Sequence, residues 1–303
     1  MAETMRKGMG WLPDYPDFRD YGMDKTDVPM RLKSLGQTDS VKAMLKKTGA
    51  LTPPKSLPTT ADLRAWCPLV EDQGDLGSCT AQAGIALVEY FEEKAFGKHE
   101  EASRLFLYKT TRNLLQWTGD TGAFLRSTMA SLVLFGAPPE EYWPYDVDGF
   151  DNEPTAFCYA YGQSYQALTY YRLDPPRTTK AKLLEQIKTN LATGLPSMFG
   201  FTVYKSIDQA AASGRIPYPS SRDKTVGGHA VVVVGYDDAL VIKNQDPGSQ
   251  ATKGALLIRN SWGTSWGESG YGWLPYDYVL NGLAEDWWSL LNNEWVDTGN
   301  FKI

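Results

Sequence analysis

The chain has 303 residues, 42% of them hydrophobic and 22% charged, which is typical of a globular protein with a sizeable core. Its formal net charge of −6 disfavours a nucleic-acid partner, because such proteins normally present a basic face. No apolar run is long enough to span a bilayer and no signal peptide is visible. We therefore expect no membrane association, and a protein that is cytoplasmic or exported by a non-standard route.

Residues 1–57 differ in composition from the rest of the chain. They contain the segment GWLPDYPDFRDYG, then a lysine-bearing stretch, and they end in the helix breaker TPPKSLP. We expect an N-terminal arm or pro-segment here, followed by one domain over residues 58–303. The arm is either a tail that packs on the body or is partly disordered, or an arm that lies over a functional cleft.

Helical patterns dominate the first half of the domain. Apolar residues recur at helical spacing from Cys79 to Gly97, where glycine ends the pattern. Similar patterns predict helices over residues 103–116, 126–136 and 178–194, the first of which begins at a serine that can cap it.

Short apolar or alternating runs follow Gly194 and are separated by Gly, Pro, Asn and Asp, as in an antiparallel sheet or barrel. This order predicts an α+β protein with a helical lobe over about residues 70–165 and a β lobe over about residues 166–295. A cleft between two lobes is a frequent place for a ligand site.

One of the three cysteines, Cys79, lies where the glycine-rich loop DQGDLGS meets a helix. A thiol in the first helical turn is close to unpaired backbone N–H groups and the positive end of the helix dipole, which favour the thiolate. The alternative is a small buried hydrophobic residue. The other two cysteines are Cys67 and Cys158, and if a disulfide exists we expect it between them.

A cysteine nucleophile normally needs a histidine base, and the chain has two histidines. His99 lies in a charged stretch that is typical of the surface, whereas His229 enters the apolar strand AVVVV and is the candidate base. Asn260 follows the next β segment and could orient the imidazole, while Trp262 could cover that bond; turn and packing roles are the alternatives. Two histidines and scattered cysteines show no metal-ligand spacing, so we expect neither metal nor cofactor.

Gln73 precedes the cysteine in the same loop, and its side-chain amide could stabilise an oxyanion together with the Cys79 backbone N–H. The alternative is a glutamine that only stabilises the loop.

The motifs QGDLGSC, GGHAV and RNSWGTSWGESGYG together resemble those of the papain-like cysteine peptidases, and the short leader resembles that of bacterial members. The resemblance implies a two-lobed fold, with a helical lobe, an antiparallel β-barrel-like lobe and the active site between them. It implies Cys79 as nucleophile, His229 as base, Asn260 as orienter and Gln73 as oxyanion donor, with Trp262 and Trp266 shielding the triad.

The resemblance also implies a substrate-binding wall at Gly122, with Phe124 nearby, and a specificity pocket near Met198. Leu76 and Thr80 depart from the family pattern, but neither position carries a catalytic group. We expect a monomer that hydrolyses peptide bonds in a peptide or protein substrate and is restrained by its arm. The alternatives are a thiol-dependent acyl transferase, a special amide hydrolase or a non-catalytic peptide-binding module.

Overall fold

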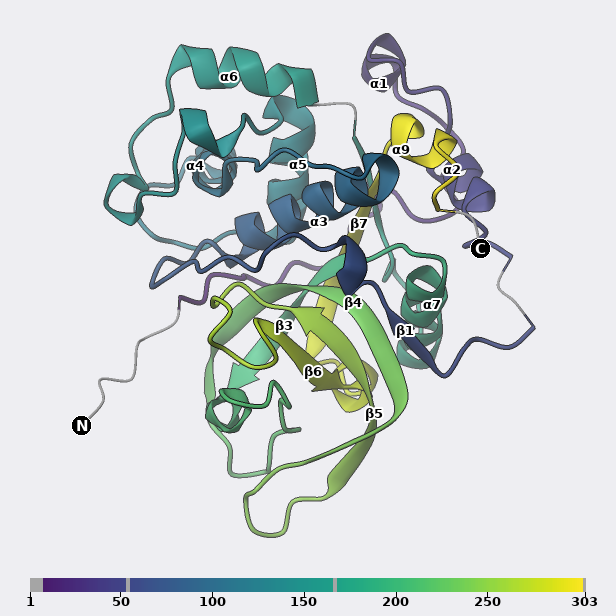
Figure 1. Cartoon of the computed structure of the whole chain (residues 1–303), viewed down its shortest axis with the longest axis vertical. Helices are drawn as coiled ribbons and strands as arrows, with labels where there is room; N and C mark the ends of the chain where they lie inside the picture. Colours follow the sequence, from purple (N-terminus) through teal and green to yellow (C-terminus); the bar gives the residue numbers. More distant parts are fainter. Residues whose placement is uncertain (1–7, 53–54, 166–167, 302–303) are drawn as a thin grey trace.

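The computed structural model describes residues 8–52, 55–165 and 168–301 (Figure 1). Four helices form the helical lobe: α3 (Cys79–Phe96), α4 (Arg104–Leu115), α5 (Leu125–Phe135) and α6 (Ala156–Gly162). The helices expected from Cys79, from Ser103 and from residue 126 are confirmed. The Ser103 hydroxyl accepts the Phe106 N–H at 3.1 Å, and Gly97 ends α3 at a φ of 70°. The short helix α6 was not expected.

The second lobe is one antiparallel sheet in the order β2-β7-β3-β4-β5-β6, with β1 paired to β4. Its strands are β1 (Thr60–Asp62), β2 (Thr169–Arg172), β3 (Ser197–Tyr204), β4 (Thr225–Lys243), β5 (Ala251–Arg259), β6 (Tyr271–Pro275) and β7 (Ala284–Leu291). The sheet curls strongly (Figure 1) but does not close, because the described strands β2 and β6 each pair with a single neighbour. The expected antiparallel lobe is confirmed, and it is an open sheet rather than a barrel.

The predicted helix over residues 178–194 is confirmed as α7 (Lys180–Ala192), which packs against β1 and β4. The remaining α-helices are α1 (Met30–Ser34), α2 (Val41–Lys47), α8 (Tyr276–Leu280) and α9 (Asn293–Asp297). Short 3₁₀ helices cover Arg64–Trp66, Glu140–Tyr142, Val147–Gly149, Gln163–Tyr165 and Lys205–Ala210.

Helix α3 lies between the two lobes and joins their cores (Figure 1). Its buried face packs on α4 and α5 on one side and on β4 on the other. On the sheet, the Phe199 and Trp287 rings stack with their centroids 3.9 Å apart. The buried apolar side chains of both lobes therefore form one continuous cluster, which fixes the position of the first turn of α3 against β4.

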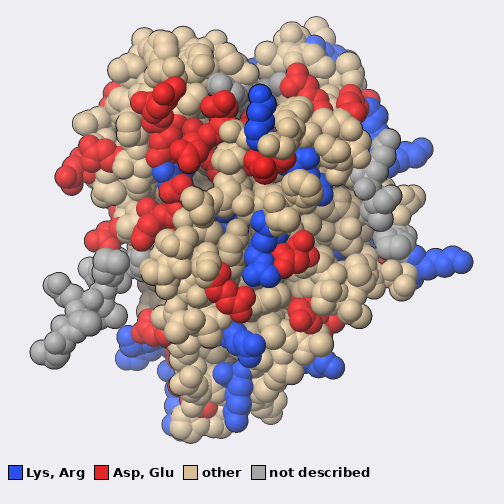
Figure 2. Space-filling view, viewed as in Figure 1, with Lys and Arg blue, Asp and Glu red and all other residues tan. Residues whose placement is uncertain are grey.

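The N-terminal segment passes between the lobes before it reaches α1 and α2 (Figure 1). Near the C-terminal end of the chain, the Asn293 Oδ1 accepts the N–H groups of Thr38 and Asp39, each at 3.0 Å, which joins the segment between α1 and α2 to the start of α9. Acidic side chains gather over the helical lobe in the view of Figure 2. In the described part of the chain, no helix combines the length and apolar character that crossing a membrane requires.

Candidate active site

Cys79 is the first residue of α3, and its side chain is fully buried. Its Sγ accepts two backbone N–H groups, from Ala230 at 3.4 Å and from Gly10 at 3.3 Å. The first donor belongs to β4, in the opposite lobe, and the second belongs to the N-terminal segment. The sulfur therefore lies where the helix, the sheet and the N-terminal segment meet.

His229 lies on β4 opposite Phe201 of β3, and its ring is fully buried. Its Nε2 is 2.7 Å from Oδ1 of Asn260, the residue that follows β5. The same oxygen accepts the Ser261 N–H at 2.8 Å, so it is an acceptor and the imidazole Nε2 donates to it. This bond leaves Nδ1 as the basic nitrogen, and Nδ1 has no hydrogen-bond partner among the described residues.

Two tryptophans pack one behind the other at the imidazole. Trp262 stacks on His229 with ring centroids 4.5 Å apart and planes 24° apart. Trp266 meets Trp262 edge to face at 5.4 Å, and both indoles are buried. His229 and Asn260 are both buried, and a hydrogen bond in such surroundings is stronger than one in water; shielding of this bond by the two indoles stays a prediction.

Gln73 is fully buried in the loop before Cys79, and the described contacts use both ends of its side-chain amide. Its Oε1 accepts the Ser261 hydroxyl at 2.5 Å, which fixes the orientation of the amide. Its Nε2 donates to the Leu76 carbonyl at 2.7 Å and to the Gly8 carbonyl at 3.2 Å. One of the two carbonyl oxygens bound by the side-chain NH₂ group, that of Gly8, therefore belongs to the N-terminal segment.

The N-terminal segment follows both walls of the site. On the β lobe, Trp11 N–H donates to the Gly228 carbonyl at 3.1 Å. On the helical lobe, Ala123 N–H donates to the Gly10 carbonyl at 2.8 Å, and its own carbonyl accepts the Leu12 N–H at 3.1 Å. Residues 8–12 are therefore held across the site by main-chain hydrogen bonds.

Two glycines let the N-terminal segment come this close. A Cβ on Gly8 would lie 2.2 Å from the Leu76 carbonyl oxygen, and a Cβ on Gly10 would lie 1.8 Å from that of Gly77. Both distances are shorter than any van der Waals contact. Backbone can lie against the nucleophile loop only because these residues have no side chain.

With the cleft filled, burial opposes charge on both reactive groups. It raises the pKa of the Cys79 thiol to about 11, although backbone N–H groups on the sulfur oppose the shift. It lowers the pKa of His229 to about 4, against the raising effect of the Asn260 hydrogen bond. At neutral pH this arrangement therefore holds a neutral thiol and a neutral imidazole.

The structure also places the other residues predicted for the site. Gly122 has a φ of 71°, and a Cβ there would lie 2.2 Å from the Gly10 carbonyl oxygen, so it lines the wall. Phe124 precedes α5 and packs on Trp117 at 5.6 Å. Met198 is fully buried on β3 opposite Val232. A role of these residues in substrate binding stays a prediction.

Several residues that shape the site were not expected. Asp120 accepts the Gly77 N–H at 3.0 Å and the Tyr108 hydroxyl at 2.6 Å, and that hydroxyl accepts the Gly122 N–H at 3.1 Å. The Tyr145 hydroxyl donates to the Gln73 carbonyl at 3.0 Å. These contacts tie the nucleophile loop to the Gly122 wall. No sequence motif marks them, whereas Ser261 lies inside RNSWG and the sequence could have singled it out.

A disulfide between Cys67 and Cys158, which the sequence left open, is not formed in the described chain. All three cysteines are free in the described chain. The Cys67 Sγ donates to the Leu63 carbonyl at 3.6 Å, while the Cys158 Sγ contacts the Tyr142 carbonyl at 3.6 Å on the helical lobe. His99, the other histidine, is 2.9 Å from Glu93 and outside the site. Among the described residues, no cluster of His, Cys, Asp or Glu could hold a metal ion.

Comparison with known proteins agrees with this geometry. The profile of the papain family of cysteine proteases matches residues 57–285. An uncharacterised peptidase C1-like protein of Acanthamoeba polyphaga mimivirus is 30% identical over 300 residues, which are 95% of this chain and 88% of the relative. A cathepsin B-like protein of Giardia intestinalis is 30% identical over 67% of this chain and 63% of its own length.

A solved structure shows the same similarity. Xylellain, a cysteine protease from Xylella fastidiosa, has a TM-score of 0.69 and 30% sequence identity, covering 96% of this chain and 98% of its own. The bromelain protease of Ananas comosus, at 20% identity and a TM-score of 0.54, shares the fold. The chain therefore belongs to the papain family of cysteine proteases.

Proposed function

We propose that the chain is an endopeptidase in which Cys79 is the nucleophile, His229 the base and then the acid, and Asn260 the group that orients the imidazole. One observation carries the proposal. His229, whose Nε2 is 2.7 Å from Asn260 Oδ1, directly precedes Ala230, and the Ala230 N–H binds the Cys79 sulfur. Three distant segments thus bring a thiol, an imidazole and an amide to one buried place.

In the proposed reaction, His229 Nδ1 takes the thiol proton and Cys79 Sγ attacks the substrate carbonyl carbon. The side-chain NH₂ of Gln73 and the N–H of Cys79 stabilise the oxyanion. The C–N bond breaks, the imidazolium gives its proton to the leaving amine, and a thioester remains. Water, deprotonated by His229, hydrolyses the thioester and releases the acid and the free thiol.

We further propose that residues 8–12 restrain this activity. Three contacts support the proposal: the Gly10 N–H on Cys79 Sγ, the Gly8 carbonyl on Gln73 Nε2, and the main-chain bonds to both walls. A substrate needs the same sulfur and the same amide. Peptide cleavage therefore requires this segment to leave first, and the full chain is a latent form.

A pair of matched glycine substitutions tests both proposals in the full chain. In Gly10→Ala the new Cβ meets the Gly77 carbonyl oxygen at 1.8 Å, whereas in Gly22→Ala the closest atom is a side-chain oxygen of Asp24 at 3.0 Å. We expect Gly10→Ala to raise turnover of internally quenched peptides at least tenfold and to speed alkylation of Cys79 by iodoacetamide. Gly22→Ala should match the wild type. Equal turnover in all three proteins would overturn the restraint.

The chemistry is tested in the Gly10→Ala background. Cys79→Ala and His229→Ala should each abolish cleavage, and mass spectrometry should find a free carboxylate at the cut. Products joined to an added amine would instead indicate acyl transfer. A peptide that binds without being cut in the Gly10→Ala chain would indicate a binding module.

A further inference from the structure

Trp11 fills a pocket of the β lobe next to the reactive groups. Its indole is buried, with 6% of the residue exposed, and it lies over two glycines. A Cβ on Gly200 of β3 would come within 1.9 Å of the indole ring, and one on Gly228 of β4 within 2.9 Å. The pocket therefore has the depth of an indole because neither strand places a side chain there.

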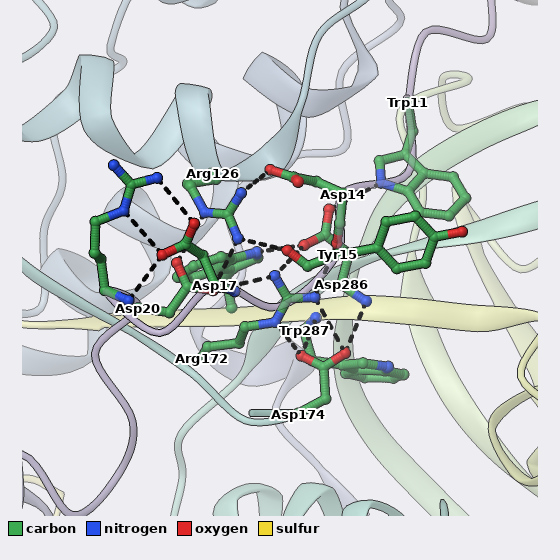
Figure 3. A network of polar contacts seen from close by, with 12 residues as sticks. Trp11, Asp14, Tyr15, Asp17, Asp20, Arg126, Arg172, Asp174, Asp286 and Trp287 are labelled. Atoms are coloured by element: carbon green, nitrogen blue, oxygen red, sulfur yellow. Dashed lines mark hydrogen bonds and ion pairs between the residues drawn. The ribbon is translucent and has the colours of Figure 1, made fainter. Parts of the chain in front are cut away.

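A single carboxylate, Asp286 of β7, contacts the polar end of the indole (Figure 3). Its Oδ2 accepts the Trp11 Nε1–H at 3.2 Å. Its Oδ1 accepts the Trp288 Nε1–H at 2.7 Å and is 3.1 Å from the Arg172 guanidinium. Oδ1 is thus bound by groups of the body, whereas Trp11 is the only hydrogen-bond donor to Oδ2 among the described contacts.

The carboxylate is also held by contacts within the body of the protein. Asp286 is 1% exposed, and its backbone N–H donates to Asp174 at 3.0 Å. Gly200, Gly228 and Asp286 belong to strands of one hydrogen-bonded sheet. The glycine walls and the acceptor therefore all belong to the sheet and not to the segment that carries Trp11.

The pocket opens beside the reaction centre. Trp11 follows Gly10, whose N–H is on Cys79 Sγ, and its own N–H binds the carbonyl of Gly228, the residue before His229. A peptide substrate that runs along the same walls places one of its side chains in this pocket.

We propose that this pocket, once vacated, selects substrates that carry a tryptophan side chain at one position, and that Asp286 is the residue that determines this specificity. The inference rests on the proposed peptidase function and names its substrate class. In the resting chain, Trp11 occupies the place of that substrate residue.

The surrounding charges favour an indole over other side chains. A lysine or arginine would meet the Arg172 guanidinium, which is already 3.1 Å from Asp286. A phenylalanine fills the volume but leaves the buried Oδ2 without a donor, a loss expected to be about tenfold or more in binding. A tryptophan satisfies both requirements, because its flat ring fits the glycine walls and its N–H meets the carboxylate.

The test uses the full chain with Gly10→Ala and Trp11→Ala, which empties the pocket. Internally quenched peptides vary one position at a time among Trp, Phe, Leu and Lys. We expect one position at which kcat/KM for Trp exceeds that for Phe and Lys at least tenfold. Adding Asp286→Asn, which turns an amide donor toward the indole N–H, should bring the Trp to Phe ratio close to one. Glu285→Gln, the neighbouring position on β7, should keep the preference.

If Asp286→Asn folds poorly, Gly200→Ala is a second variant. The new Cβ of Gly200→Ala fills the pocket, so this variant should lose more cleavage of the Trp peptide than of an Ala peptide. Calorimetry measures binding of the same peptides to the Gly10→Ala, Trp11→Ala chain that also carries Cys79→Ala. This measurement separates the peptidase hypothesis from the pocket hypothesis. Preferential Trp binding without turnover in the active form would overturn the peptidase function and support the pocket. Turnover with equal rates for Trp and Phe, or with a preference for Lys, would overturn the pocket.

Discussion

At the scale of single residues, the proposed mechanism gives Asn260 control over the state of the base, His229. Its Oδ1 holds His229 Nε2 at 2.7 Å and raises the pKa of the ring, whereas burial lowers that pKa to about 4. Removing the amide takes away the raising effect and frees the ring to turn. The imidazolium–thiolate pair then becomes less populated at every pH near neutrality.

We therefore expect Asn260→Ala in the Gly10→Ala chain to lower kcat/KM at least tenfold at neutral pH, measured with one quenched peptide. The control is Asn281→Ala, an exposed asparagine whose amide donates to the Asp277 carbonyl at 3.0 Å, away from the site. Equal kcat/KM for the Asn260→Ala and control chains would remove Asn260 from the mechanism.

Much of the site was predictable at this scale. Cys79, His229, Asn260 and Gln73 lie in short motifs, and each needs a particular chemical group, so residue type alone selects them. Asp286 could not be found in this way. It lies in the strand AEDWWSLL, where alternation suggests only a strand, and its role depends on Arg172, Trp288 and Trp11 meeting it from three other places in the sequence.

At the scale of elements, α3 carries a buried carboxyl behind the nucleophile. Glu89 is 7% exposed, and burial raises its pKa from 4.5 to about 7, although the nearby charges of Arg259, His99 and Arg104 lower it. Because the folded pKa lies above the unfolded one, the folded state holds a proton that the unfolded state releases. The contribution to stability is complete below about pH 4.5 and is lost as the pH rises through 7.

We expect the free energy of unfolding to fall as pH rises from about 4.5 to 7.5, and Glu89→Gln to reduce that slope. Urea denaturation at several pH values measures both. Asp286, whose pKa burial also raises to about 7, keeps part of the slope in the variant. Asp75→Asn, at an exposed position of the nucleophile loop, should leave the slope as in the wild type. An unchanged slope in Glu89→Gln would contradict the assignment.

The elements themselves were predictable where local signals agree. Ser103, Gly97 and Gly136 bound their helices as capping and stop residues do, and apolar spacing supplied the rest. The open sheet was not predictable, because closure depends on whether β2 and β6 meet, which no local pattern encodes. The glycines of the N-terminal segment look like turn residues, and their fit against Leu76 and Gly77 depends on contacts across the fold.

At the scale of the whole molecule, two arginines of the body hold the N-terminal segment (Figure 3). Arg126 of α5 pairs with Asp14 and, at 2.8 Å, with Asp20. Arg172 of β2 is 3.6 Å from Asp20 and donates to the Asp14 carbonyl at 3.1 Å. Charge thus adds to the main-chain bonds around Gly10.

We expect Arg126→Ala to raise the resting turnover of the full chain about fivefold, less than Gly10→Ala does, because partly exposed ion pairs contribute about 0.2–1 kcal/mol each. High salt should raise wild-type turnover and have less effect on Arg126→Ala. The matched control is Arg19→Ala, whose partner Asp17 lies within the same segment. If Arg126→Ala and Arg19→Ala behave alike, the arginines do not hold the segment.

The contact of Asn293 with Thr38 and Asp39 has one more consequence. Asn293 binds Thr38 and Asp39, and Met44 and Leu45 of α2 are fully buried, so the part of the chain that follows residues 8–12 stays fixed to the body. In the proposed latent form, residues 8–12 are thus a tethered blocker, at an effective concentration on the order of millimolar, whatever the dilution of the protein. A competing peptide must exceed that level to enter, whereas one cut in the tether would let the blocker diffuse away and make its loss irreversible.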